Sequence, residues 1–193
     1  RILRHGHWYD ANFTLPFFAK RLMKDEDYDV VIEDINKLPF FMPLYTKVPV
    51  VPVIPHLFGT TVFREANFAI GSYVVTAEKI IPHVFRNNTF QVISPSTRDD
   101  LVTRGIPADR IEVILCGLDH DRYRDLGLER YGQPTIVHLG RLRKYKSVEI
   151  AMKAMETVRK KVPGARLVIV GDGPYRPELE RDADELGMGD TIE

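Results

Sequence analysis

The segment Thr135–Lys146, TIVHLGRLRKYK, decides the fold that we predict for this chain. Its first half reads as a parallel strand covered on both faces, because apolar and β-branched residues run up to Leu139, and Gly140 then lets the backbone turn sharply. Four cationic side chains follow before a predicted helix: Arg141, Arg143, Lys144 and Lys146. Ligands of open α/β sheets bind at the carboxyl ends of strands, and helix N-termini attract anions. The segment therefore predicts a phosphate-binding loop.

A second strand and turn repeat this arrangement. The apolar run RLVIV, residues 166–170, leads into the tight turn GDGP, residues 171–174, and then into another predicted helix. The helix between the two strands carries apolar residues at helical spacing: Val148, Ala151, Met152, Met155 and Val158. A right-handed crossover would make the two strands neighbours and bring both turns to one edge of the sheet. The predicted fold class is α/β with Rossmann-like parallel sheets.

These motifs resemble the donor-binding half of a family 4 (group 1) glycosyltransferase with the GT-B fold. The similarity rests on GRL-x-x-Y-K-S, on PGARLVIVGDGP, and on LGMGD after the next helix. The resemblance implies that Arg141, Lys146 and Gly140 bind the diphosphate of a nucleotide sugar, and that Gly171 and Gly173 bind its nucleotide. The family's usual Gly after the Lys is replaced here by a serine at position 147.

Upstream segments resemble the end of the family's acceptor-side domain: YDVVIEDIN (28–36), PVVPVIPHLFG (49–59) and FQVISPSTRDDLVTRG (90–105). His56 corresponds to a histidine that lines the reaction centre, which implies a catalytic role. Ser94 matches a serine at a strand end that faces the cleft between the domains. The resemblance divides the chain into a partial acceptor-side domain (1–118), a linker (119–133) and a partial donor domain (134–193).

The implied activity is transfer of a sugar from a nucleotide diphosphate sugar to a hydroxyl acceptor with retention, and no cofactor or metal beyond this donor substrate is implied. The acceptor could be a sugar or a lipid-linked sugar, and the donor's sugar and base are open. The family's glycine-rich loop and E-x7-E motif would lie before Arg1 and after Glu193, so we expect a chain truncated at both ends. The alternative is a truncated or reduced GT-B scaffold that binds nucleotide weakly or not at all and has no turnover.

Composition limits the other partners. With 193 residues, of which 44% are hydrophobic, the chain can bury a core. Its 27 Lys and Arg residues balance 27 Asp and Glu residues, so no nucleic-acid partner is predicted. The single cysteine, Cys116, fits a reducing cytoplasm, with a membrane-peripheral location left open. An incomplete sheet could leave an open edge through which the chain self-associates.

Each candidate site also has a structural interpretation. Arg141 and Lys146 could be solvated loop charges, and His56 could be a hydrogen-bonded residue at a strand end. Gly171 and Gly173 could serve the turn alone. The histidines and the aspartate of HGHWYD, residues 5–10, are not expected to form a metal site.

Some local features remain open at this stage. The apolar segment LPFFMPLY, residues 38–45, could be core or an exposed patch that binds a partner. We predict a helical region over residues 61–85 that Gly71 and Pro82 interrupt, and a helix over 96–104 capped by Ser96.

Overall fold

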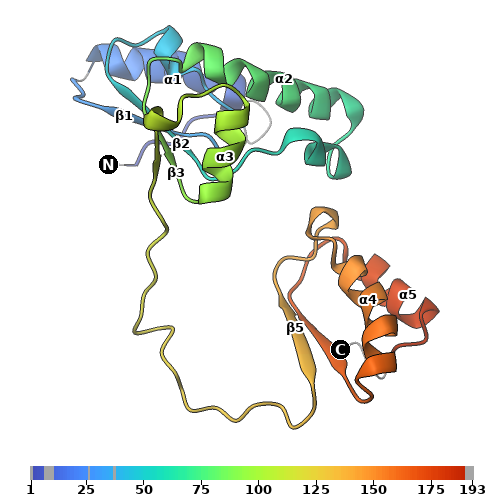
Figure 1. The fold of residues 1–193 in the computed structure, drawn as a ribbon. Coiled ribbons are helices and arrows are strands. Elements are labelled where there is room, and N and C mark those ends of the chain that lie inside the picture. The colour runs from blue at the N-terminus through green and yellow to red at the C-terminus, as the bar shows by residue number, and fades with distance from the viewer. Residues whose placement is uncertain (1, 7–10, 26, 37, 190–193) are drawn as a thin grey trace. The chain divides into compact units, whose positions relative to one another are not determined.

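The structure is a computed structural model, and it describes residues 2–6, 11–25, 27–36 and 38–189. The described residues divide into two compact units, Arg1–Leu118 and Asp119–Glu193, each with its own sheet and its own core (Figure 1).

The first unit alternates strands with helices. Its α-helices are α1 (Ala11–Asp25), α2 (Phe68–Val84) and α3 (Pro95–Thr103). Its strands are β1 (Val31–Asp34), β2 (Val50–Ile54), β3 (Phe90–Val92) and β4 (Ile111–Val113). Short 3-10 helices lie at η1 (Met42–Leu44), η2 (Gly59–Arg64) and η3 (Ala108–Arg110).

The sheet of this unit has the order β1-β2-β3-β4, and every neighbouring pair is parallel. Val31 lies opposite Val50, and Phe90 lies opposite Ile111. Because the strands are parallel, their carboxyl ends meet at one edge of the sheet. His56 follows β2 and Ser94 follows β3 at that edge.

The core of the first unit is built from alternate strand residues and from one face of each packed helix. Ile54, Val92, Ile81 and Leu101 are fully buried in it. Phe40, Phe41 and Tyr45 pack against this cluster, and Met42 belongs to it. The segment 38–45 is therefore mainly core, although Leu44 is exposed.

Helix α2 is continuous from Phe68 to Val84, so the predicted interruption at Gly71 and Pro82 is wrong. Gly71 is buried, and a Cβ at this position would overlap the ring of Phe63. The missing side chain thus makes room for an aromatic ring. Pro82 lies in the last turn, and although it cannot donate to the carbonyl four residues earlier, the helix continues to Val84.

The second unit consists of β5 (Thr135–Leu139), η4 (Lys144–Lys146), α4 (Val148–Lys161), β6 (Arg166–Val170) and α5 (Arg176–Glu185). Strands β5 and β6 are parallel and in register from Thr135 opposite Arg166 to Leu139 opposite Val170. This pairing confirms the predicted strand, helix, strand unit.

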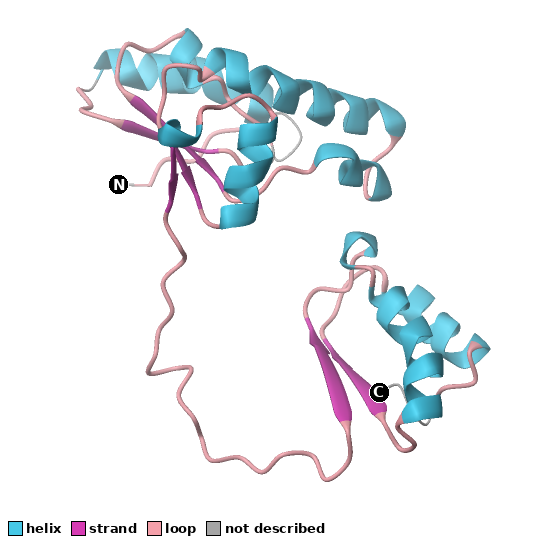
Figure 2. Ribbon diagram, viewed as in Figure 1, coloured by secondary structure: helices cyan, strands magenta, loops and turns pink. Residues whose placement is uncertain are grey.

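The predicted apolar face of α4 is confirmed. Val148, Met152 and Met155 are buried, and they pack with Leu167 of β6 and Leu179 of α5. Figure 2 shows α4 and α5 side by side next to the strands of this unit.

The prediction that β5 is covered on both faces is wrong for the described residues. Ile136 is 46% exposed, Val137 53% and Leu139 79%. In the part of the chain that the structure describes, β5 pairs with β6 and lies at the edge of the sheet. Residues 114–134, between β4 and β5, form turns and irregular backbone and no helix or strand (Figure 2).

Candidate functional site

The loops after β5 and β6 continue the pairing of their strands. The N–H of Gly140 donates to the carbonyl of Val170 at 3.0 Å, and the N–H of Leu142 donates to the carbonyl of Asp172 at 2.9 Å. The N–H of Tyr175 then donates back to the carbonyl of Leu142 at 3.2 Å. These bonds fix the two loops against each other, at the edge where the sequence predicts an anion site.

Gly171 and Gly173 are required by this close approach. A Cβ at position 171 would overlap the carbonyl oxygen of Gly140, and a Cβ at position 173 would overlap the carbonyl oxygen of Leu142. Gly140 differs, since a Cβ there would meet His138 Nε2 at an ordinary 3.7 Å and its φ is not positive. The predicted need for glycine in a sharp turn at 140 is therefore wrong. The roles of these three glycines in nucleotide and diphosphate binding stay predictions.

The first of these loops presents cations to solvent. Arg141 and Lys146 are exposed, while Leu142 between them is buried and anchors the loop to the core. Within the described residues, neither Arg141 nor Lys146 forms an ion pair with a carboxylate. The Lys146 ammonium lies over the ring of Tyr145, 5.2 Å from its centroid. Both charges are therefore available to an incoming anion.

Ser147 joins this loop to α4 in a left-handed conformation, with φ 54° and ψ 40°. Such a conformation favours glycine, because a Cβ crowds the backbone there. The glycine that is usual at this position in the resembled family thus has a local steric reason.

His56 lies at the carboxyl edge of the first unit's sheet. Its side chain is exposed, and its ring meets the ring of Phe58 edge-on at 5.0 Å. Preceding it, the carbonyl of Pro55 accepts a hydrogen bond from Thr97 Oγ1 at 2.9 Å. Following it, the N–H groups of Phe58 and Gly59 donate to the carboxylate of Glu78 on α2.

Ser94 is the N-cap of α3, so the predicted cap at Ser96 is wrong. The Ser94 hydroxyl accepts a hydrogen bond from the N–H of Thr97 at 3.2 Å and lies 2.9 Å from Thr97 Oγ1. Pro95 occupies the first turn, where a missing N–H costs nothing. The structure thus links Ser94, through Thr97, to the segment that carries His56. A cleft-lining role for Ser94 stays a prediction.

Glu33 is buried, and its carboxylate accepts hydrogen bonds from the N–H groups of Phe40 (2.6 Å), Phe41 (3.0 Å) and Met42 (3.0 Å). Burial raises the pKa of Glu33, while these three hydrogen bonds oppose the rise. Burial and the charge of Glu33 raise the pKa of the nearby Tyr45 to about 12. Asp34 next to Glu33 is exposed, as expected for neighbours on a strand.

Sequence reasoning did not find the roles of Glu33, Glu78 and Thr97. Their partners are backbone groups of loops 7 to 42 residues away, and no spacing motif marks such contacts. The available signal was a glutamate at a strand or helix position that is expected to be buried.

The described residues contain no group of three or more His, Cys, Asp or Glu side chains that could hold a metal ion. His7 and Asp10, two residues of the HGHWYD segment, lie outside the described residues. Among the helices that the structure describes, none is both long enough and apolar enough to cross a membrane.

Two family models match the chain. The model described as Glycosyltransferase Family 4 matches residues 3–122, more than half of the chain, and the model described as Glycosyl transferases group 1 matches residues 119–193.

Individual relatives match over shorter stretches. The chain is 33% identical over 109 residues to the GDP-mannose-dependent alpha-(1-6)-phosphatidylinositol monomannoside mannosyltransferase of Mycolicibacterium smegmatis, a match that covers 52% of this chain and 28% of that protein. It is 28% identical over 113 residues to the alpha-D-kanosaminyltransferase of Streptomyces kanamyceticus, covering 52% of this chain and 29% of that one. The chain therefore spans less than a third of the length of these relatives.

Among solved structures, the Anabaena protein HepE in complex with UDP and glucose superposes with a TM-score of 0.66 at 15% sequence identity, covering 97% of this chain and 52% of that one. The lipopolysaccharide outer core galactosyltransferase WaaB superposes with a TM-score of 0.57 at 15% identity, covering 96% and 48%. Similarity at this level of identity establishes the fold.

Proposed function

The chain belongs to glycosyltransferase family 4, with the Rossmann-like α/β fold of GT-B glycosyltransferases, and from this membership we propose that it transfers a sugar from a nucleotide diphosphate sugar to a hydroxyl acceptor. In the proposed reaction the bond between the anomeric carbon and the donor phosphate breaks, and a bond to the acceptor oxygen forms with retention. The acceptor hydroxyl gives up its proton to the departing nucleotide diphosphate, which leaves.

The observation that carries this proposal is the pair of available cations on the loop after β5. Arg141 and Lys146 are exposed and unpaired with carboxylates in the described part of the chain, and they lie on a loop that makes backbone hydrogen bonds to the neighbouring loop. Negative charge grows on the diphosphate as the sugar leaves, so cations held in place stabilise the transition state more than the ground state. Removing one such donor typically raises the barrier by about 3–4 kcal/mol.

The second part of the proposal concerns His56 and Ser94 of the first unit. The exposed imidazole of His56 can donate or accept a hydrogen bond, which suits it to orient a sugar or acceptor hydroxyl. Ser94 lies on the neighbouring strand end, joined to the His56 segment through Thr97. We assign His56 to the reaction centre and the diphosphate to Arg141 and Lys146.

The names of two similar proteins supply candidates for the donor's base. The mycobacterial relative is named as dependent on GDP-mannose, and the Anabaena structure holds UDP and glucose. Both bases carry the same diphosphate, so the cation loop suits either one. The acceptor class in this proposal is a sugar or a lipid-linked sugar.

Isothermal titration calorimetry with UDP, GDP, UDP-glucose and GDP-mannose tests the donor site. The R141A/K146A double variant should weaken binding at least about tenfold, because each lost charge-assisted hydrogen bond is worth about 1.5–3 kcal/mol. A K153A/K160A variant is the matched control, since it removes the same charge from the exposed face of α4.

Unchanged affinity in the double variant would contradict the assignment of Arg141 and Lys146. Absence of binding to all four compounds by the parent chain would favour the alternative, a GT-B scaffold without nucleotide binding. Equal loss in the control would indicate a general effect of charge and no specific site.

A further inference from the structure

Glu78 is a charged side chain inside the core of the first unit, and it is 1% exposed. Its two carboxylate oxygens divide between two neighbouring backbone donors. Oε1 accepts a hydrogen bond from the N–H of Phe58 at 2.7 Å, and Oε2 accepts one from the N–H of Gly59 at 2.9 Å. A guanidinium nitrogen of Arg104, the C-cap of α3, lies 3.6 Å from Oε2. The buried charge is therefore both paired and hydrogen-bonded, as its burial requires.

Arg104 is itself held in place. Its Nε lies 3.1 Å from both carboxylate oxygens of Asp100, one helical turn earlier on α3. Its other guanidinium nitrogen lies 3.7 Å from the point where a Cβ of residue 59 would stand, and Gly59 adopts a left-handed φ of 52°. Two charged side chains, Glu78 and Arg104, thus meet at one backbone turn, and Asp100 holds Arg104 in place.

This turn begins two residues after His56. On the other side of the histidine, the carbonyl of Pro55 is bound by Thr97. The backbone is therefore fixed on both sides of His56, while the imidazole itself remains exposed.

We propose that Glu78 is a positioning residue, which sets the direction in which His56 projects from the carboxyl edge of the sheet. The inference rests on the proposed role of His56 in the reaction centre. Displacement of a reacting group by about 1 Å costs about a hundredfold in rate, so a buried anchor next to an exposed catalytic side chain has a direct use. Arg104 supports the same turn through its ion pair with Glu78, and Thr97 holds the backbone on the other side of His56.

The test variant is Glu78→Gln, which keeps the shape of the side chain. A glutamine has one acceptor oxygen and an NH2 group, so one of the two N–H groups of Phe58 and Gly59 loses its partner. Glu33→Gln is the matched control. Glu33 is equally buried and also binds backbone N–H groups, but those belong to the segment at 40–42.

NMR spectroscopy of the whole chain supplies the readout. In the parent, the amides of Phe58 and Gly59 should be protected from hydrogen exchange, and the rings of His56 and Phe58 should show a mutual nuclear Overhauser effect. In Glu78→Gln, exchange at the amide that loses its partner should speed up by at least about tenfold, and the contact between the rings should disappear. Glu33→Gln should leave all of these signals at their parent values.

Two results would overturn the inference. One is that Glu78→Gln retains both the amide protection and the ring contact; the other is that Glu33→Gln loses them to the same extent. If Glu78→Gln does not fold, hydrogen exchange of the parent chain is the test. Unprotected Phe58 and Gly59 amides in the parent would refute the anchor. The calorimetry of the Arg141 and Lys146 variant fails or succeeds independently, so it separates failure of the proposed function from failure of this anchor.

Discussion

Ser147 holds a backbone conformation that costs an L-residue about 1–2 kcal/mol. We expect Ser147→Gly to unfold less readily than Ser147→Ala by about 1 kcal/mol, because both variants remove the hydroxyl and only the alanine keeps the Cβ that crowds the backbone. Denaturant unfolding followed by the amide signals of residues 135–188 measures the difference. Equal stability of the two variants would show that the left-handed conformation is not strained.

Tyr45 gives a prediction about pH. Its hydroxyl is buried and has no hydrogen-bond partner among the described residues, so Tyr45→Phe should be neutral or stabilising by up to about 1 kcal/mol at pH 7. Because the pKa is raised from 10 to about 12, the folded unit favours the neutral phenol. That contribution is complete below pH 10 and is lost as the pH rises through about 12.

The parent should therefore lose stability relative to Tyr45→Phe between pH 10 and pH 12. Urea unfolding at several pH values measures this difference, and Tyr73→Phe, whose ring is exposed, serves as the control. A difference between parent and Tyr45→Phe that does not change with pH would refute the assignment.

At the scale of elements, the paired loops after β5 and β6 depend on Gly173. We expect Gly173→Ala to destabilise the second unit by about 1–3 kcal/mol, because its Cβ would meet backbone atoms of Leu142 that cannot move without breaking the pairing of the loops. Hydrogen exchange of the amides in β5 and β6 measures the loss. Gly132→Ala, where a Cβ meets nothing within 4 Å, should change nothing, and an equal effect of both variants would contradict this explanation.

The elements themselves could largely be predicted from the sequence. Helical spacing identified the buried face of α4, and the apolar run at 166–170 identified β6, because burial of one helix face or one strand leaves a periodic pattern. The cation loop followed from its position after such a strand. These properties are local, because they depend on residues that lie close together in the sequence.

What could not be predicted depends on contacts between distant residues. The sequence predicts that Gly71 interrupts the helix, but in the structure the ring of Phe63 fills the space beside Gly71. The anchoring of two loops by Glu33 and Glu78 leaves no periodic mark. The apolar sequence of β5 likewise does not predict which face of the strand other elements cover. Only the capping error was avoidable, since Pro95 in the first turn pointed to Ser94 as the cap.

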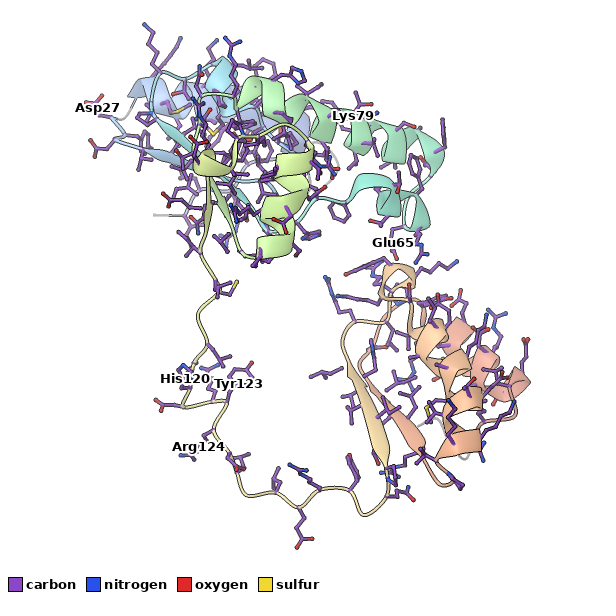
Figure 3. The ribbon with its side chains drawn as sticks, viewed as in Figure 1. Asp27, Glu65, Lys79, His120, Tyr123 and Arg124 are labelled. Carbon is purple, nitrogen blue, oxygen red and sulfur yellow. The ribbon has the colours of Figure 1, made fainter. Side chains whose placement is uncertain are left out.

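At the scale of the whole molecule, residues 114–134 join the two units without a helix or strand, and every side chain among them is exposed. The side chains of His120, Tyr123 and Arg124 stand out from this segment in Figure 3. We expect trypsin to cut first at Arg122, Arg124 or Arg130, because a protease needs an extended, accessible backbone. The ion pair between Arg122 and Asp119 is on the surface and protects little.

Mass spectrometry of a short digestion identifies the first cuts. Arg159 and Lys160 are the internal comparison, since they are equally accessible but belong to α4. First cleavage within α4 would mean that the helix opens more easily than the connecting segment, which would contradict the prediction.

The dependence of two loops on buried glutamates has a consequence for protein engineering. A designer who transplants residues 55–59 into another scaffold to move the histidine would leave the recipient with two unbonded N–H groups in its interior. The transferable module is discontinuous: it consists of the loop together with Glu78 from α2, Thr97 from α3 and Arg104 at the end of α3. The same holds for residues 40–42, because a transplant of this segment must include Glu33. Exchange of a loop in this fold therefore requires exchange of the residues that the loop contacts. A chimaera joined at the ends of the loop lacks the side chains that hold the loop in its conformation.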